Sequence, residues 1–342
     1  MPTELVSYLS TLSYTNFPLS CNLYFSKQVI IVGDNTDMTN PNKHSETNNI
    51  STSRRTILRA GSAAVAITGL AGCSALPGGG LGGFNYTQYL YDPDEVDTNS
   101  YQFNYFKPST IVENEDEFDD DVYDGTEDSL SISNLTDIDY DEIQHVVQAG
   151  QTTVIAANFT KEDVVDELED NDFDDDDEIS GYETFYNEQE TQGVAIQDNR
   201  VIHTGNLRYN SNFDPEDLLE LVIESESGDA DRYADAYDSF GPLTDNLGSG
   251  TVVTGTAFDD ESDFIGLENV VAYGGSLSVN GESSNVKFVF VHDDEGDPDR
   301  DDAEDFTDEI EDIDDTSIST SGRVTEITGS TDTDDLTSIS PF

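Results

Sequence analysis

The stretch TTVIAANFTKEDVVDEL, residues 152–168, places a strand pattern directly before a helix pattern. Residues 152–159 are rich in β-branched and apolar side chains, which is typical of a buried strand. Thr160, with Asp163 three residues later, marks a helix start, and apolar residues recur behind it at helical spacing. This order of a strand followed by a capped helix is the unit from which we predict the fold.

Similar patterns continue on both sides of this stretch. Further strands are expected at residues 101–106, 129–135, 182–187, 193–197, 201–204, 251–258, 269–279, 286–292 and 316–327. Further helices are expected at residues 139–150, from Asp214 and Pro215 onward, at 233–240 and at 299–313. Asp198 and Asn199 lie where a two-residue hairpin turn would.

Strands, helices and hairpins are interspersed, so the expected fold class is α+β. We expect a mainly antiparallel sheet, or sheets, with helices packed on one face. Two related α/β halves are an arrangement that also fits the pattern. One part would be an α+β domain at residues 101–258, and the other a β-β-α-β part at 259–329, followed by a polar tail at 330–342.

The composition of the 342-residue chain is strongly acidic. Asp and Glu number 74 against 13 Lys and Arg, for a formal charge of −61, and 35% of the residues are hydrophobic. These values fit either a disordered chain or a folded protein that works in concentrated salt. At about 1 M salt the Debye length is roughly 3 Å, so neighbouring carboxylates repel weakly. The periodic apolar segments favour the folded, halophilic protein. Its carboxylates would associate cations diffusely. Because the sequence has no basic patch, nucleic acid is not expected as a partner.

Residues 53–73 have the features of an export signal. Arg54 and Arg55 are followed by a short apolar segment, 60–70, which is shorter than the about 20 residues that span a bilayer. Leu70-Ala71-Gly72-Cys73 is similar to the site at which lipoproteins are cleaved and lipidated. In these motifs and in its acidity the chain resembles haloarchaeal surface lipoproteins of unknown function that the twin-arginine machinery exports.

That resemblance implies a division of the N-terminal region. Residues 38–72 would be the signal peptide, and 73–100 a Gly-rich tether that begins at the lipidated Cys73. Residues 1–37 are poor in acids, and we interpret them as lying upstream of the true start codon at Met38. A lipid on Cys73 would hold the protein on the extracellular face of the cell membrane, and twin-arginine export would carry it there already folded.

Residues with catalytic or metal-binding spacing are few. His145, His203 and His292 are in no metal-ligand spacing, so we expect them to be partly exposed, and the sequence predicts neither a catalytic group nor a cofactor.

A weak calcium candidate uses the acids around residue 175. Asp172, Asp174, Asp176 and Glu183 have the spacing of positions 1, 3, 5 and 12 of an EF-hand loop. However, Asp177 stands at position 6, where the loop needs glycine.

Three sequons, at Asn85, Asn134 and Asn158, are candidate glycosylation sites in an exported protein. Asn85, in the expected tether, should be the most accessible, and Asn158 the more enclosed.

The sequence therefore predicts a lipid-anchored extracellular surface protein with a non-enzymatic binding or envelope role. Two alternatives remain open. One is a solute-binding lipoprotein of an uptake transporter, which needs two lobes with parallel sheets. The other is an extracellular hydrolase.

Overall fold

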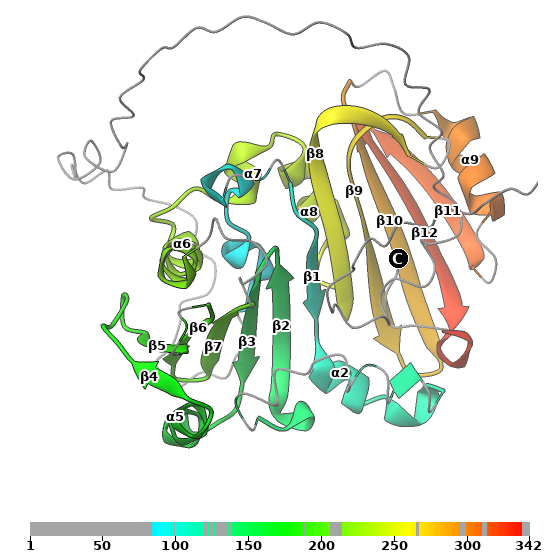
Figure 1. Ribbon diagram of the computed structural model, residues 1–342. Coiled ribbons are helices and arrows are strands. Elements are labelled where there is room, and N and C mark those ends of the chain that lie inside the picture. Colours follow the sequence, from blue (N-terminus) through cyan, green and yellow to red (C-terminus); the bar gives the residue numbers. More distant parts are fainter. Residues whose placement is uncertain are drawn as a thin grey trace, which may run out of the picture. The chain divides into compact units, whose positions relative to one another are not determined.

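The computed structural model describes residues 84–336, except for 97, 99, 120–121, 124–125, 127–135, 137, 188, 190, 206–213, 265–266, 295–298 and 310–312. The described strands form one sheet, and helices pack against it (Figure 1). The strands are β1 (Phe103–Phe106), β2 (Ile143–Ala149), β3 (Thr152–Ala157), β4 (Phe173–Asp175), β5 (Glu183–Asn187), β6 (Gly193–Gln197), β7 (Arg200–Thr204), β8 (Val252–Phe264), β9 (Leu267–Asn280), β10 (Ser283–His292), β11 (Asp314–Ser321) and β12 (Val324–Asp332). The helices are α2 (Pro108–Val112), α5 (Lys161–Asp170), α6 (Pro215–Ser227), α7 (Tyr233–Ala236), α8 (Phe240–Leu247) and α9 (Arg300–Glu309).

The twelve strands lie in the order β11-β12-β10-β9-β8-β1-β2-β3-β7-β6-β5-β4. Every pairing between these described strands is antiparallel. The α+β class with a mainly antiparallel sheet is therefore confirmed. β1 pairs with β2 on one side and with β8 on the other. It therefore joins the group β2–β7 to the group β8–β12. The boundary expected between residues 258 and 259 falls inside β8, so both parts belong to one sheet.

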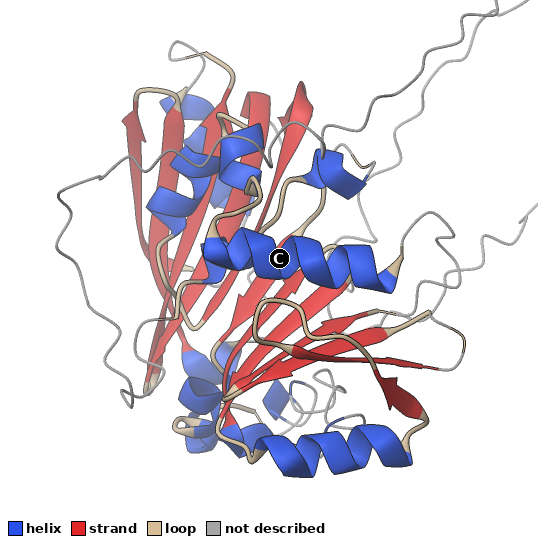
Figure 2. Ribbon diagram, turned by 90° about the vertical axis from the view of Figure 1, so that its left-hand side faces the viewer, coloured by secondary structure: helices blue, strands red, loops and turns tan. Residues whose placement is uncertain are grey.

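Helices lie against both faces of the sheet rather than one (Figure 2). The strands explain this arrangement, because several are buried on both sides. In β3, Val154 belongs to the cluster that packs with α6, α7 and α8, whereas the next residue, Ile155, packs with α5. The second face also carries α9, whose Phe306 contacts the rings of Phe288 and Phe290. A strand without polar alternation needs such cover on each side.

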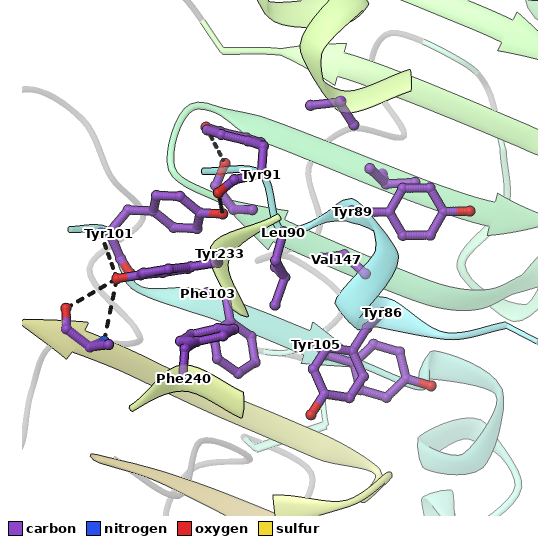
Figure 3. Close-up of a cluster of buried hydrophobic side chains, with 14 of the residues drawn as sticks. Tyr86, Tyr89, Leu90, Tyr91, Tyr101, Phe103, Tyr105, Val147, Tyr233 and Phe240 are labelled. Atoms are coloured by element: carbon purple, nitrogen blue, oxygen red, sulfur yellow. Dashed lines mark hydrogen bonds between the residues drawn. The ribbon is translucent and has the colours of Figure 1, made fainter. Parts of the chain in front are cut away.

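The segment after residue 84 is part of the core, so the expectation of a tether as far as residue 100 is wrong there. Tyr86, Tyr89, Leu90 and Tyr91 are at most 5% exposed. Two 3-10 turns, Tyr86–Tyr89 and Pro93–Val96, place these side chains beside β1 and α7 (Figure 3). Burial of large aromatic side chains is strongly favourable, so these tyrosines stabilise a packed segment over a flexible linker in water.

The helix expected at residues 139–150 is a strand, β2. Its apolar residues lie on both faces of the sheet, with Val146 in one cluster and Val147 in another. The pairing with β3 shifts between Ile143 and His145, as at a β-bulge, which places Ile143 on the same face as Val146. These two effects produce the three-residue spacing that resembled a helix. Gly150, with φ of 55°, is in the turn to β3 rather than at a helix end.

Two other expected elements are each divided. The strand expected at 316–327 is the β11–β12 hairpin, which turns at Gly322 with φ of 58°. The helix expected at 233–240 is split into α7 and α8, because Tyr237 has an extended backbone. β12 continues to Asp332, so the polar tail begins later than expected.

The remaining expectations vary in outcome. The expected starts of α5 and α6, and the expected bounds of β5, β6 and β7, are confirmed to within one residue. Asn199, in the β6–β7 turn, has the positive φ of 62° that was expected of it. Asp214 caps α6 by accepting a hydrogen bond from the backbone N–H of Glu216. The strand expected at 129–135 lies outside the described residues.

Candidate functional site

The chain that leaves the expected tether is fastened to the sheet by a group of polar and aromatic residues. We call this group the docking site, and its members are Phe84, Tyr89, His145, Tyr182, Arg200 and Glu226. Arg200 is the first residue of β7, and Glu226 is in the last turn of α6. α6 packs across β6 and β7, which brings Glu226 over Arg200.

Glu226 is bonded to three donors from separate segments. Its Oε1 accepts hydrogen bonds from Tyr89 Oη, at 2.8 Å, and from a guanidinium nitrogen of Arg200. Its Oε2 accepts one from Tyr182 Oη at 2.6 Å. The side chains of Arg200 and Glu226 are 16% and 20% exposed, so this ion pair is mostly removed from water. Hydrogen bonds to a charged group contribute about 1.5–3 kcal/mol each, which makes this carboxylate a strong fastening point.

Burial raises the pKa of Tyr89 and Tyr182 well above the ordinary value, and the nearby Glu226 carboxylate raises both further. Both phenols therefore stay neutral near pH 7 and act as donors. Because both of its oxygens are bonded, Glu226 is suited to holding the N-terminal segment that contains Tyr89 in place.

Aromatic rings complete the docking site. The Arg200 guanidinium lies 5.4 Å from the ring centre of Phe84 and 5.3 Å from that of Tyr89. Phe84 stacks on His145 with 4.6 Å between ring centres, and His145 Nδ1 is hydrogen-bonded to Tyr105 Oη at 2.9 Å. A cation over aromatic faces contributes about 0.5–2 kcal/mol. The first described residue of the chain is thus already held by the body.

Figure 3 shows the neighbouring tyrosines that continue this fastening into the core. Tyr233 Oη is bonded to the carbonyl oxygens of Ala257 and Tyr101, at 3.0 and 3.3 Å. Tyr101 Oη donates to Tyr91 O at 2.6 Å, and Tyr91 Oη donates to Ala149 O at 3.1 Å. These bonds link the N-terminal segment to β2, β8 and α7.

A pocket of about 180 Å³ opens beside these tyrosines. Its described lining residues are all uncharged: Tyr91, Val96, Thr98, Ser100, Tyr101, Gly150, Gln151 and Leu218. Its volume is below the about 300 Å³ at which ligand pockets usually begin.

The calcium candidates are not brought together as an EF-hand loop. Asp174 lies in β4, where an EF-hand would need a tight loop. Glu183 lies in β5 and forms an ion pair with Lys161 at 2.7 Å. Asp172 and Asp176 flank β4. Among the described residues, the acids whose ligand atoms gather within 4.8 Å of one another are Asp332, Asp334 and Asp335, all exposed.

The histidines differ in their surroundings. His292 is buried, contrary to expectation, with Nδ1 bonded to Glu268 O and Nε2 to Thr325 Oγ1. Burial lowers the pKa of His203 to about 4, so it is neutral at pH 7. His203, whose Nε2 is buried, and His145 are partly exposed, as expected.

Other sequence-predicted sites are outside the described residues: Arg54, Arg55, Cys73 and Asn134. Asn85 and Asn158 are both exposed, so Asn158 is more accessible than its sequence suggested. Sequence reasoning missed the docking site altogether. The tyrosines at 86, 89 and 91 were a signal for it, since a tether has no use for three aromatic side chains.

No protein-family model matches the chain, and no curated protein is similar to it. Among solved structures it is similar to crystal form III of TP0453, with 8% identity and a TM-score of 0.44, over 74% of this chain and 96% of that one. Crystal form I of TP0453 gives 10% identity and a TM-score of 0.42, over 73% and 94% of the two chains. Of the described helices, none has the length and apolar character needed to cross a membrane.

Proposed function

We propose that this protein is a lipid-anchored extracellular surface protein of a halophile, with a non-enzymatic binding or envelope role. The observation that carries the proposal is the docking of Phe84 so soon after Cys73. Only residues 74–83 separate them, and ten extended residues span at most about 35 Å. A lipid on Cys73 would therefore hold the folded body close to the membrane surface.

The docking site suits such an attachment. Any pull on the tether reaches the body at Phe84, where Arg200 and His145 hold the ring. The Glu226 ion pair and the buried tyrosines then distribute the load over several strands. A flexible linker between a lipid and a folded domain would not need these hydrogen bonds and ring contacts.

The use of the few cations supports the halophilic part of the proposal. Three of them bind backbone carbonyls at or just after helix ends: Arg232 at Ser225 and Glu226, Lys287 at Asn246, and Lys107 at Ser249. Cations are favourable there because the last carbonyls of a helix lack partners. Lys287 also pairs with Glu326 at 3.3 Å. Because 13 cations face 74 acids and these three bind backbone carbonyls, the acidic surface depends on salt to screen its charge.

The geometry favours this function over the alternatives. A two-lobed solute-binding protein was expected to have parallel sheets, whereas the described strands pair antiparallel throughout. For a hydrolase, the mostly buried Glu226 is one candidate acid among the described residues, and its oxygens are bonded to Tyr89, Tyr182 and Arg200.

Two sets of variants test the proposal by cell fractionation. Cys73→Ser should move the protein from the membrane fraction to the medium. Replacing both Arg54 and Arg55 by Lys should retain the precursor inside the cell. Membrane retention of Cys73→Ser would contradict the lipid anchor, and normal export of the double Lys variant would contradict the twin-arginine route.

A further inference from the structure

Two of the three sequons lie among the described residues, and the fold treats them differently. Asn85-Tyr86-Thr87 is in the segment that docks on the core, and Asn158-Phe159-Thr160 joins β3 to α5. An enzyme that glycosylates a folded protein recognises the asparagine amide and the hydroxyl of the third residue, and the backbone of all three residues must fit into its binding cleft. Exposure of the asparagine is therefore necessary but does not decide between the two.

The Asn85 sequon is tied into the fold. Asn85 Oδ1 accepts hydrogen bonds from Thr87 N at 3.2 Å and from Thr87 Oγ1 at 2.9 Å. The middle residue, Tyr86, is 5% exposed and stacks on Tyr105 with 4.9 Å between ring centres. Its hydroxyl donates to Gly248 O at 3.2 Å. Reading this sequon would require Tyr86 to leave the core.

The Asn158 sequon is available without such a change. Asn158 is exposed and is held through its backbone N–H, which donates to Glu142 O at 3.1 Å. Thr160 is also exposed, with an extended backbone (φ −89°, ψ 121°), and its hydroxyl makes no capping bond to α5. Phe159 between them is only partly buried. The side-chain amide and the hydroxyl that define the sequon are thus both accessible.

We propose that Asn158 carries an N-linked glycan and that Asn85 does not. This choice of Asn158 over Asn85 rests on the proposed export of the folded chain, because the glycosylating enzyme then acts on the surface of the folded protein. In the reaction, Asn158 Nδ2 would attack the anomeric carbon of a lipid-linked sugar phosphate. The new C–N bond forms as the C–O bond to phosphate breaks, the amide proton passes to a base of the enzyme, and the lipid phosphate leaves.

The glutamate-specific peptides of the native protein test this directly by mass spectrometry. Cleavage after Glu142 and Glu162 isolates residues 143–162, which contain Asn158 and exclude Asn134. The expected result is a glycan mass on this peptide and none on Asn85 in the peptide that ends at Glu95. Absence of glycan from Asn158, or equal or higher occupancy at Asn85, would overturn the proposal.

The same digest keeps the two proposals separate. The peptide that ends at Glu95 also contains Cys73, so it reports the lipid independently of the glycan on residues 143–162. A lipidated Cys73 with an unmodified Asn158 would overturn this inference alone.

Substitutions of Thr160 provide the matched control. Thr160→Ser keeps a hydroxyl and should retain the glycan, whereas Thr160→Val should lose it although Asn158 is unchanged. Circular dichroism should show both variants folded, since the Thr160 side chain makes no cap bond. Retention of the glycan in Thr160→Val would contradict recognition of this sequon.

Discussion

The guanidinium of Arg200 and the carboxylate of Glu226 form an ion pair that joins the first residue of β7 to the last turn of α6. The pair is also the meeting point of Phe84 and Tyr89, which come from a segment far away in the sequence. It therefore connects the point where the chain enters the fold to both a strand and a helix. This connection is the structural basis of the first prediction, and the second concerns Leu90 in the same N-terminal segment.

Glu226→Gln should lower the free energy of unfolding by about 2–4 kcal/mol. The change leaves the mostly buried Arg200 without its counter-charge, and breaking a buried pair from one side is costly. Urea unfolding in concentrated salt measures the loss. Glu304→Gln is the matched control, because its pair with Arg300 is 55–62% exposed and should matter by less than about 0.5 kcal/mol. Equal effects of the two variants would show that the docking site adds nothing.

Leu90→Ala should lower the free energy of unfolding by about 2–4 kcal/mol, because Leu90 is 0% exposed and its removal leaves a cavity. Thermal unfolding followed by circular dichroism checks this. Val165→Ala, at a partly exposed position of α5, should cost less. If residues 84–96 were only a tether, Leu90→Ala would have no effect.

Acid should destabilise the protein partly through His203. The unfolded chain takes up a proton near pH 6.5, whereas burial lowers the pKa of folded His203 to about 4. Stability is therefore lost as pH falls from about 6.5 toward 4, by roughly 2 kcal/mol between pH 7 and pH 5. In His203→Gln the unfolding free energy should fall less over that interval. Parallel pH profiles for the two proteins would contradict this assignment.

Low salt should unfold the protein. Between about 1 M and 0.1 M salt the Debye length grows from roughly 3 to 10 Å, so the surface carboxylates begin to repel one another. We expect far-ultraviolet circular dichroism to be lost in dilute buffer and kept in potassium chloride. A neutral osmolyte at equal osmolality should protect less, because it screens no charge. Identical spectra in dilute and concentrated salt would contradict a halophilic surface.

Local signals made several elements of this fold predictable. Asp214 and Pro215 at the start of α6 act within one helical turn, and Asn199 acts within one hairpin, so both are visible in the sequence. β2 was mistaken for a helix, because a bulge after Ile143 and burial of both faces gave it a helix-like spacing. Such cases depend on what covers the strand, which local sequence does not contain.

Apart from the signal of the tyrosines at 86, 89 and 91, the docking site was beyond sequence reasoning for a similar reason. Tyr89 and Glu226 are 137 positions apart, and Arg200 and Glu226 are 26 apart. In a chain with 74 acids, no pattern distinguishes Glu226 from the solvated carboxylates. Its three donors become evident only once the sheet and α6 are assembled.

The mass of the N-terminal peptide of the native protein tests the central claim most directly. Glutamate-specific digestion should release a peptide that begins at Cys73, ends at Glu95 and carries the added mass of a lipid on the cysteine. A peptide that begins upstream of Cys73, or one with an unmodified Cys73, would contradict the account of a lipid-anchored surface protein.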